Sequence, residues 1–296
     1  MASAYVTLSD RGVVALRGPE TRAFLQGIVS NDVSRVTPAQ AIYAALLTPQ
    51  GKFLFDFFIV EHAGDLLLEV ERSRLPQLVQ RLTMYRLRSK VEIEDASERL
   101  DVAVLFGDEI PAKLDLEAIP GACRGLADGV VFLDPRLPTL GARALLPGGQ
   151  VETTLQALGL QPGSPEGYDE LRLRQGVPDG SRDLVVEKST LMESGFDELH
   201  GVDFKKGCFV GQELTARMKY RGLVRKRLMP VILKGPAPEP GTPILLDGRE
   251  AGEMRSSSNG RGIALIRLEH LAKAEDKPLL AGETEVVPQK PEWANF

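Results

Sequence analysis

Residues 236–243 are crowded with helix-breaking residues: Pro236, Pro238, Pro240, Gly241 and Pro243. Proline lacks a backbone N–H and fixes φ, so no helix can run through this stretch. Short apolar segments separated by glycine or polar turns follow: PILLDG, REAGEMRSS, RGIALIRLE and ETEVVP. Evenly spaced short strands indicate a small β-barrel that begins near residue 223. Within it, residues 272–282 are expected to form a loop or a short helix.

The chain before this barrel mixes strand and helix patterns. Turn residues at Pro49-Gln50-Gly51 and Ala63-Gly64-Asp65 divide residues 41–71 into three expected strands. Amphipathic or helix-forming stretches follow at 72–89, 151–160 and 164–180. The pattern predicts an α+β fold with antiparallel sheets and helices laid on one face. We expect an N-terminal α+β region over 1–145, a largely helical segment over 146–222, and the barrel over 223–296.

Composition narrows the function. The formal net charge of −5 argues against a general nucleic-acid binder, which normally carries a basic surface. No export signal opens the sequence, and no apolar run approaches the roughly 18 residues that span a bilayer. Two cysteines make no disulfide framework in 296 residues, so a reducing, cytoplasmic setting is expected. The sequence has no coiled-coil pattern, so a monomer is expected.

The stretch KKGCFVGQE, Lys205 to Glu213, holds one of the two cysteines. Gly207 and Gly211 flank Cys208, and helix-forming residues follow. A thiol just ahead of a helix N-terminus, beside lysines, would favour its thiolate form. An equally tenable interpretation is a small buried apolar residue. The three histidines are scattered, so the chain predicts no stable metal site of its own, although Cys208 could serve as a transient ligand of a shared cluster.

The longer stretch KKGCFVGQELTARMKYRG resembles the K-G-C-(Y/F)-x-G-Q-E signature of YgfZ-type folate-binding proteins, relatives of the aminomethyltransferase (T-protein) of the glycine cleavage system. Four further segments agree in order: FLQGIVSNDV, LLTPQGKFLFDFFI, YRLRSKVEI and LRLRQGVPDG. The resemblance implies an aminomethyltransferase-like fold, ring-like, with a folate-sized channel and a C-terminal barrel. It also implies a role in assembling or repairing iron–sulfur clusters, chiefly [4Fe–4S], with tetrahydrofolate as ligand. Cluster assembly proteins and [4Fe–4S] client enzymes would be the partners.

Carried onto this sequence, the resemblance assigns roles to individual residues. Cys208 would be the functional thiol. The residues expected to shape its loop or to bind folate are Gly207, Gly211, Gln212, Glu213, Arg217 and Arg221. The two arginines could pair with a folate glutamate tail, or form a solvated basic face. Asn31 and Asp32 would border the channel, although both residue types also suit a simple turn.

Two positions depart from the T-protein pattern. LRLRQG places Arg174 where T-proteins carry the glutamate that binds the pterin ring. Either another carboxylate, such as Glu187 or Asp197, replaces it, or the affinity for the pterin ring is weaker. Asp56, in GKFLFDFF, is the remaining member of an acidic pair, so it is either a catalytic carboxylate or a hydrogen-bonded strand residue.

Three functions remain open. The leading hypothesis is a tetrahydrofolate-binding factor that assists iron–sulfur cluster assembly through Cys208. The second is a folate-dependent aminomethyltransferase. The third is a non-catalytic scaffold that binds protein or tRNA, with a link to tRNA modification, and it rests on the basic run KYRGLVRKR at 219–227. The acidic balance of the chain makes nucleic acid the least expected partner.

Overall fold

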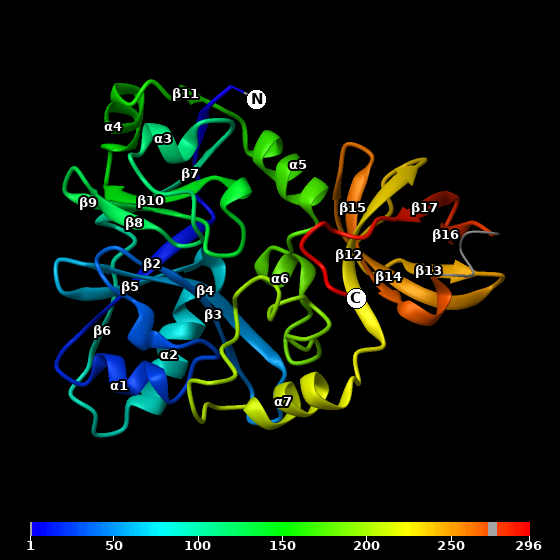
Figure 1. The fold of residues 1–296 in the computed structure, drawn as a ribbon, viewed down its shortest axis with the longest axis horizontal. Helices are drawn as coiled ribbons and strands as arrows, with labels where there is room; N and C mark the ends of the chain where they lie inside the picture. The colour runs from blue at the N-terminus through cyan, green and yellow to red at the C-terminus, as the bar shows by residue number, and fades with distance from the viewer. Residues whose placement is uncertain (1, 272–276) are drawn as a thin grey trace. The chain divides into compact units, whose positions relative to one another are not determined.

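The computed structural model describes residues 2–271 and 277–296 (Figure 1). They form two compact units, each assembled from several stretches of the chain. Unit 1 holds the residues up to Leu47, Leu54–Tyr168 and Leu199–Val210, and unit 2 holds Thr48–Phe53, Asp169–Glu198 and Gly211–Phe296. The division into 1–145, 146–222 and 223–296 stays a prediction.

Unit 1 is built on two sheets. The five-stranded sheet has the order β3-β4-β5-β2-β6, with bounds β3 Ile42–Leu47, β4 Phe53–His62, β5 Asp65–Glu71, β2 Arg11–Arg17 and β6 Glu92–Asp95. Its β4–β5, β2–β5 and β2–β6 pairs are antiparallel. The short helix α1 (Thr21–Gln26) and the longer α2 (Leu75–Arg86) belong to the same part of the chain, and α2 contacts β2 and β6.

The second sheet of unit 1 has the order β11-β1-β7-β10-β9-β8. Its strands are β11 Gln161–Pro162, β1 Ala4–Thr7, β7 Leu100–Phe106, β10 Ala142–Pro147, β9 Gly129–Leu133 and β8 Cys123–Leu126. All of its pairs are antiparallel except β1–β11. The short helices α3 (Ile110–Lys113) and α4 (Val151–Ala157) contribute Ile110, Val151 and Leu155 to its apolar core. The strands β1 and β2 follow each other in the chain but belong to different sheets.

The turns fall where the sequence predicts them. Between β4 and β5 the chain reverses at Ala63 and Gly64, with φ of 51° and 85°. Two successive positive φ values are typical of the tight hairpin turn that follows the twist of paired strands. Nearly every residue of β2 and β4 is buried, so both faces of this sheet are covered. This explains why these strands are continuously apolar rather than alternating.

A buried carboxylate lies between the two sheets of unit 1. Glu69, on β5, is completely buried and accepts a hydrogen bond from Arg11 Nε on β2. Its other oxygen accepts from Arg143 Nη1 on β10, at 3.0 Å. Both arginines are also buried, so the Glu69 carboxylate offsets part of their charge, and the Asp134 carboxylate lies 3.8 Å from Arg143 Nε.

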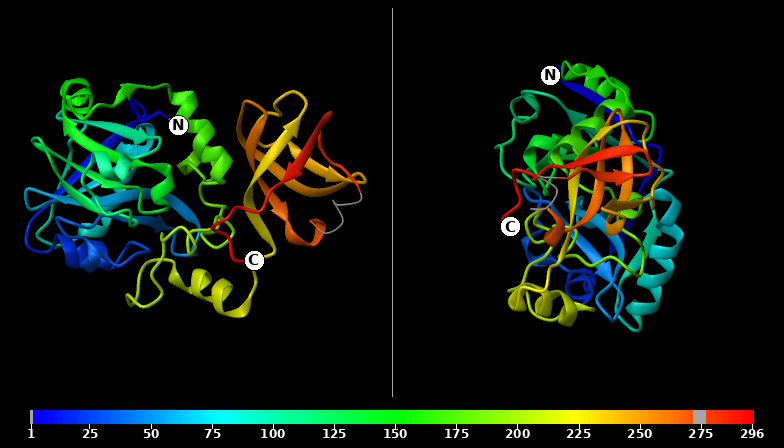
Figure 2. Two further views of the ribbon diagram at one scale, coloured as in Figure 1. Left: turned by 45° about the horizontal axis from the view of Figure 1, so that its top comes forward. Right: turned by 90° about the vertical axis from the view of Figure 1, so that its right-hand side faces the viewer.

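Unit 2 contains the predicted barrel. Its closed order is β12-β15-β14-β13-β16-β17, with bounds β12 Lys226–Lys234, β15 Arg261–Arg267, β14 Arg249–Ser258, β13 Pro243–Leu246, β16 Leu279–Ala281 and β17 Thr284–Pro288. Figure 2 shows the barrel strands in the yellow, orange and red part of the ribbon. The expected loop or short helix over 272–282 lies partly outside the described residues, and its last part is strand β16 rather than loop.

The helices of the remaining chain are α5 (Pro165–Gln175), α6 (Gly180–Asp183) and α7 (Gln212–Arg221). Short 3-10 turns occupy Val33–Arg35, Arg72–Arg74, Pro138–Leu140 and Leu268–His270. The predicted class, an α+β fold with antiparallel sheets and a small C-terminal barrel, is confirmed. None of the described helices combines the length and apolarity that a membrane-spanning segment requires.

Replacing Glu69 with glutamine tests the buried ionic cluster. The change removes the charge of the carboxylate that both buried arginines share, which should lower the free energy of unfolding by about 3–5 kcal/mol. Urea denaturation measures the loss. The control is Glu94→Gln. This change breaks the ion pairs that the exposed Glu94 forms with Arg17 and Arg99, and it should cost about 0–1 kcal/mol. Equal losses in the two variants would contradict the role of the buried cluster.

Candidate functional site

The loop that carries Cys208 is held in unit 1 by the residue two positions before it. Lys206 Nζ donates hydrogen bonds to the backbone oxygens of Gln26, at 2.5 Å, and Val29, at 2.8 Å. The same ammonium lies 5.1 Å from the ring centroid of Phe209, a cation–π distance. Phe209 is only 8% exposed. One side chain on each side of Cys208 is therefore anchored.

Between these anchors, Gly207 and Cys208 are exposed. Gly207 has φ of 95°, a left-handed conformation that favours glycine. Nothing lies within 4 Å of the position that a Cβ would occupy there, so backbone conformation rather than crowding requires glycine. The thiol of Cys208 is accessible, and its interpretation as a small buried residue is wrong.

Gln26, at the end of helix α1, binds the loop that carries Cys208. Its side-chain amide donates to Asp32 Oδ1, at 3.0 Å, and to the backbone oxygen of Lys206, at 3.3 Å. Its side-chain oxygen accepts from the Val33 amide at 2.8 Å. Gln26 thus links the turn after α1 to the cysteine loop.

The charged groups beside the thiol perturb one another. Burial lowers the pKa of Lys206 to about 8, while the nearby charges of Asp32, Asp203 and Cys208 act in the opposite direction. Burial raises the pKa of the Asp32 carboxyl, but hydrogen bonds from Ser34 and Gln26 and the charge of Lys206 outweigh it and lower the pKa overall. An ammonium whose pKa is lowered to about 8 therefore lies two residues from an accessible thiol.

Asn31 positions the loop rather than a ligand. It is 2% exposed, and its side-chain nitrogen donates to the backbone oxygens of Tyr43 and His200, both at 2.7 Å. Its side-chain oxygen accepts from the Asp32 amide at 2.9 Å. Every polar atom of this side chain is engaged within the protein. His200 itself contacts the Pro135 oxygen through Nδ1, at 3.2 Å.

Asp56 lies on β4 and is buried, 7% exposed. The Tyr43 hydroxyl donates to its Oδ2 at 2.8 Å. Burial and the charge of Asp56 raise the pKa of Tyr43 well above its ordinary value, so the phenol keeps its proton and remains a donor. Arg136 lies 5.4 Å from the Tyr43 ring centroid, and its own charge is balanced by Asp134 at 2.7 Å. The hydrogen-bonded strand residue is the interpretation of Asp56 that these contacts favour.

The other predicted site residues belong to unit 2. Helix α7 begins at Gln212, after Gly211 with φ of 81°. Glu213 and Arg217 form an ion pair on its exposed surface, and Arg221 is exposed near its end. Glu187 is exposed, has φ of 62°, and donates its backbone amide to the Phe53 oxygen at 2.8 Å.

Arg174 and Asp197, the other residues considered for binding of the pterin ring, also lie in unit 2. Arg174 is exposed, whereas its neighbour Arg172 is buried and pairs with Asp183 at 2.7 Å. Asp197 pairs with Lys219 at 2.8 Å. Of the two carboxylates considered as replacements for the T-protein glutamate, Glu187 is exposed, whereas Asp197 Oδ1 is buried and has no hydrogen-bond partner among the described residues.

Across residues 2–271 and 277–296, no group of three or more His, Cys, Asp or Glu side chains is placed to hold a metal ion. Cys123 and Cys208 are both free thiols. A cluster bound at Cys208 would need its remaining ligands from another molecule.

The sequence places Lys206 two residues from Cys208, but it does not indicate that Lys206 anchors the loop. It gives no sign that Gln26 contacts the loop. The only signal for Gln26 was its position inside the segment FLQGIVSNDV, whose importance came from resemblance. The pairing of a glutamine side chain with a loop that lies far away in the sequence, at Lys206, has no local pattern.

Comparisons with known proteins agree with this architecture. The family described as CAF17, C-terminal beta-barrel domain, matches residues 225–296. The iron–sulfur cluster assembly factor IBA57, mitochondrial, of Mus musculus is 33% identical over 95% of this chain and 83% of its own length. Its Homo sapiens counterpart is 33% identical over 88% of this chain and 76% of its own length.

A solved structure supports the fold. The glycine cleavage system aminomethyltransferase T from Bartonella henselae superposes with a TM-score of 0.80, over 99% of this chain and 86% of its own, at 15% sequence identity. The expected aminomethyltransferase-like fold is confirmed. The expected cytoplasmic location is contradicted, because the names of the mouse and human relatives place those proteins in mitochondria.

Alkylation of the native protein distinguishes its two cysteines. Cys208 is exposed, whereas burial raises the pKa of Cys123 to about 12. At pH 8 a thiol with such a pKa is ionised in only about one molecule in ten thousand. Iodoacetamide followed by peptide mass spectrometry should therefore modify Cys208 and leave Cys123 intact until urea is added. Equal modification of both cysteines in the native protein would contradict the burial of Cys123, and an unmodified Cys208 would contradict the exposed loop.

The proton of Lys206 gives a second test. With the side chain labelled for NMR, its titration midpoint should lie near pH 8. Asp32→Asn should move the midpoint lower, because it removes a negative charge that holds the proton. Asp128→Asn, at an exposed turn, is the control and should leave it unchanged.

The same shift predicts a stability change. Between about pH 8 and the ordinary lysine value of 10.5, the unfolded chain binds this proton and the folded chain does not. This lysine should therefore make the protein more stable as the pH rises through that window. A Lys206→Met variant should lack this part of the pH dependence, and an unchanged dependence would contradict the burial of the ammonium.

Proposed function

The chain belongs to the IBA57 family of iron–sulfur cluster assembly factors, and we propose that it assists cluster assembly by offering the Cys208 thiolate as a temporary ligand. The earlier resemblance to YgfZ-type proteins is confirmed at the family level, with IBA57 as the specific branch. The observation that carries the proposal is the exposed thiol held between the anchors Lys206 and Phe209.

A single accessible thiolate suits a transfer step. Iron–sulfur clusters are held mainly by cysteine thiolates, usually four of them. Since no group of three metal-binding side chains surrounds Cys208 in the described residues, the chain offers one ligand and leaves the others to the donor or recipient protein. One ligand binds a cluster weakly enough to release it. Exchange of one thiolate for another requires no change in the oxidation state of iron.

Lys206 contributes electrostatically to such a step. A cluster ligated by four thiolates carries net negative charge, so an ammonium two residues from Cys208 attracts it. The ammonium is held by two backbone oxygens and by the Phe209 ring, which keeps it close to the loop. With a pKa of about 8, it is mostly protonated at neutral pH. Following the family resemblance, we propose [4Fe–4S] enzymes as the main recipients.

Tetrahydrofolate binding is a separate proposal, suggested by the aminomethyltransferase-like fold. The residues fit it poorly, because Arg174 stands at the place of the pterin-binding glutamate and Glu187 is exposed. The Asp56 carboxylate already accepts a hydrogen bond from the Tyr43 hydroxyl. No step of the proposed function therefore depends on folate. Titration calorimetry with tetrahydrofolate tests it, and the absence of heat at millimolar ligand would dismiss folate while leaving the role of the thiol untouched.

A gene replacement tests the proposed function. In the host organism, deletion should reduce the activity of a [4Fe–4S] enzyme several-fold while a [2Fe–2S] enzyme changes little. The native gene should restore activity and Cys208→Ser should not. Cys123→Ala is the matched control, because it removes the other thiol, and it should restore activity. Immunoblots confirm that all variants accumulate equally.

Two outcomes would contradict the proposal at different points. Full restoration by Cys208→Ser would show that cluster assembly does not use this thiol. Unchanged activity of both enzymes after deletion would dismiss the role in cluster assembly. In the latter case, tetrahydrofolate-dependent turnover of an aminomethyl donor would support the transferase alternative.

A further inference from the structure

A polar pocket lies entirely within unit 2, and its residues are separate in sequence from the loop that carries Cys208. It has a volume of about 290 Å³ and lies between residues 185–194 and barrel strands β12, β14 and β15. Three cationic side chains line it: Lys188, Lys226 and Arg255. Two carboxylates, Glu193 and Glu253, also line it, so positive charge exceeds negative charge by one.

Arg255 is the least exposed of the three cations, at 6%. Its Nη1 donates to Glu253 and to the backbone oxygen of Met254. Its Nε is buried and has no hydrogen-bond partner among the described residues. A guanidinium offers five donors in a planar fork, and here one edge of that fork is left without an acceptor. Buried donors without partners are rare in folded proteins, and they point to a missing acceptor.

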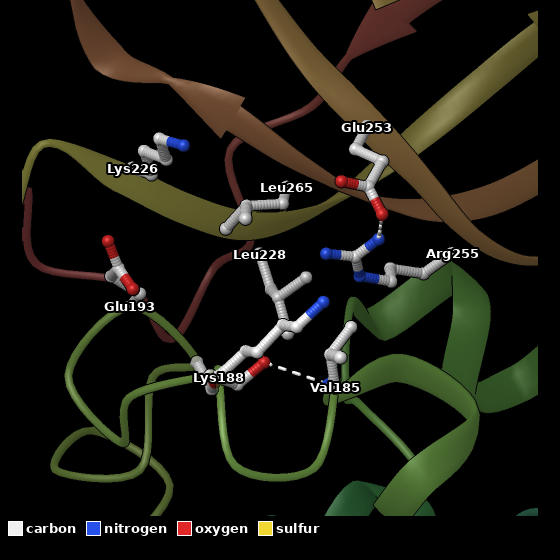
Figure 3. A pocket seen from close by; sticks show the side chains of 10 residues that line it. Val185, Lys188, Glu193, Lys226, Leu228, Glu253, Arg255 and Leu265 are labelled. Carbon is white, nitrogen blue, oxygen red and sulfur yellow. Dashed lines mark hydrogen bonds and ion pairs between the residues drawn. The ribbon is translucent and has the colours of Figure 1, made fainter. Parts of the chain in front are cut away.

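Lys188 faces the same space. Figure 3 shows its ammonium and the Arg255 guanidinium both reaching into the pocket beside Leu228. Lys188 is exposed and forms no ion pair within the described chain. Two cations directed into one pocket repel each other unless an anion lies between them.

The walls of the pocket add an apolar element. Val185, Leu228 and Leu265 line it together with the charged groups. The loop side is fixed to the barrel, because the Leu228 amide donates to the Glu193 backbone oxygen at 2.8 Å. The Thr190 hydroxyl holds the Glu193 side chain at 2.8 Å. The pocket is therefore a built feature rather than a gap between mobile side chains.

We propose that this pocket binds a small organic acid whose carboxylate pairs with the Arg255 guanidinium and with the Lys188 ammonium. A carboxylate has two oxygens in a plane and matches the fork of a guanidinium in two hydrogen bonds. The leucines and Val185 would contact a short hydrocarbon part. This site is independent of the thiol function, because none of its residues belongs to unit 1.

Titration calorimetry on the full chain tests the site, with succinate as the probe. Succinamide, its uncharged counterpart, should not bind. Lys188→Gln should weaken succinate binding about tenfold, because a hydrogen bond to a charged group is lost. Since Lys188 is exposed and unpaired in the described residues, this variant should fold normally. Lys234→Gln removes an exposed lysine at the end of strand β12, outside the pocket, and should leave the affinity unchanged.

Three results would overturn the assignment. Succinate could fail to bind at millimolar concentration. Lys188→Gln and Lys234→Gln could weaken it equally, which would indicate only general charge attraction. Inorganic phosphate, titrated in parallel, could bind while succinate does not, which would show that the pocket accepts a tetrahedral anion rather than a carboxylate.

Discussion

The buried carboxylate of Glu69 joins the two sheets of unit 1, and the positions of the site residues depend on that junction. It accepts from Arg11 in one sheet and from Arg143 in the other. Arg143 also donates to the Tyr168 hydroxyl, at 3.2 Å, and lies 4.5 Å from the Phe58 ring centroid. Replacing all three ionic side chains with apolar ones could be neutral for stability, whereas removing one leaves a buried charge. The cluster is therefore better understood as fixing one arrangement of the sheets.

From these sheets a chain of contacts leads to the functional loop. The Tyr43 backbone on β3 and the His200 backbone are bridged by the amide of Asn31. Ser30 binds the Gly201 oxygen through its hydroxyl, at 2.6 Å. Lys206 then anchors the loop to the end of α1. Beyond this anchor, Gly207 and Cys208 are exposed to solvent. A thiol that must meet a cluster on another protein needs both properties, a fixed base and an exposed tip.

Much of the fold could be predicted from the sequence because its signals are local. The prolines at 236–243 and the glycine turns indicated the barrel, and Ala63-Gly64-Asp65 indicated the β4–β5 hairpin. The motif around Cys208 pointed to this loop through resemblance. What escaped prediction depends on contacts between distant residues. Arg11, Glu69 and Arg143 are unremarkable charges in sequence, and only the sheet pairing brings them together. Asn31 suited a turn equally well, until the structure showed all of its polar atoms engaged.

The central claim is that Cys208 ligates a cluster, and the visible circular dichroism of a bound cluster tests it directly. A [2Fe–2S] cluster ligated by glutathione has little dichroism until a protein thiolate replaces one of its ligands in a chiral environment. Added anaerobically to the purified chain, it should give a new visible dichroism signal with native protein and with Cys123→Ala, but none with Cys208→Ser. An identical signal from Cys208→Ser would show that the cluster binds elsewhere or without this thiol, and the account would be wrong.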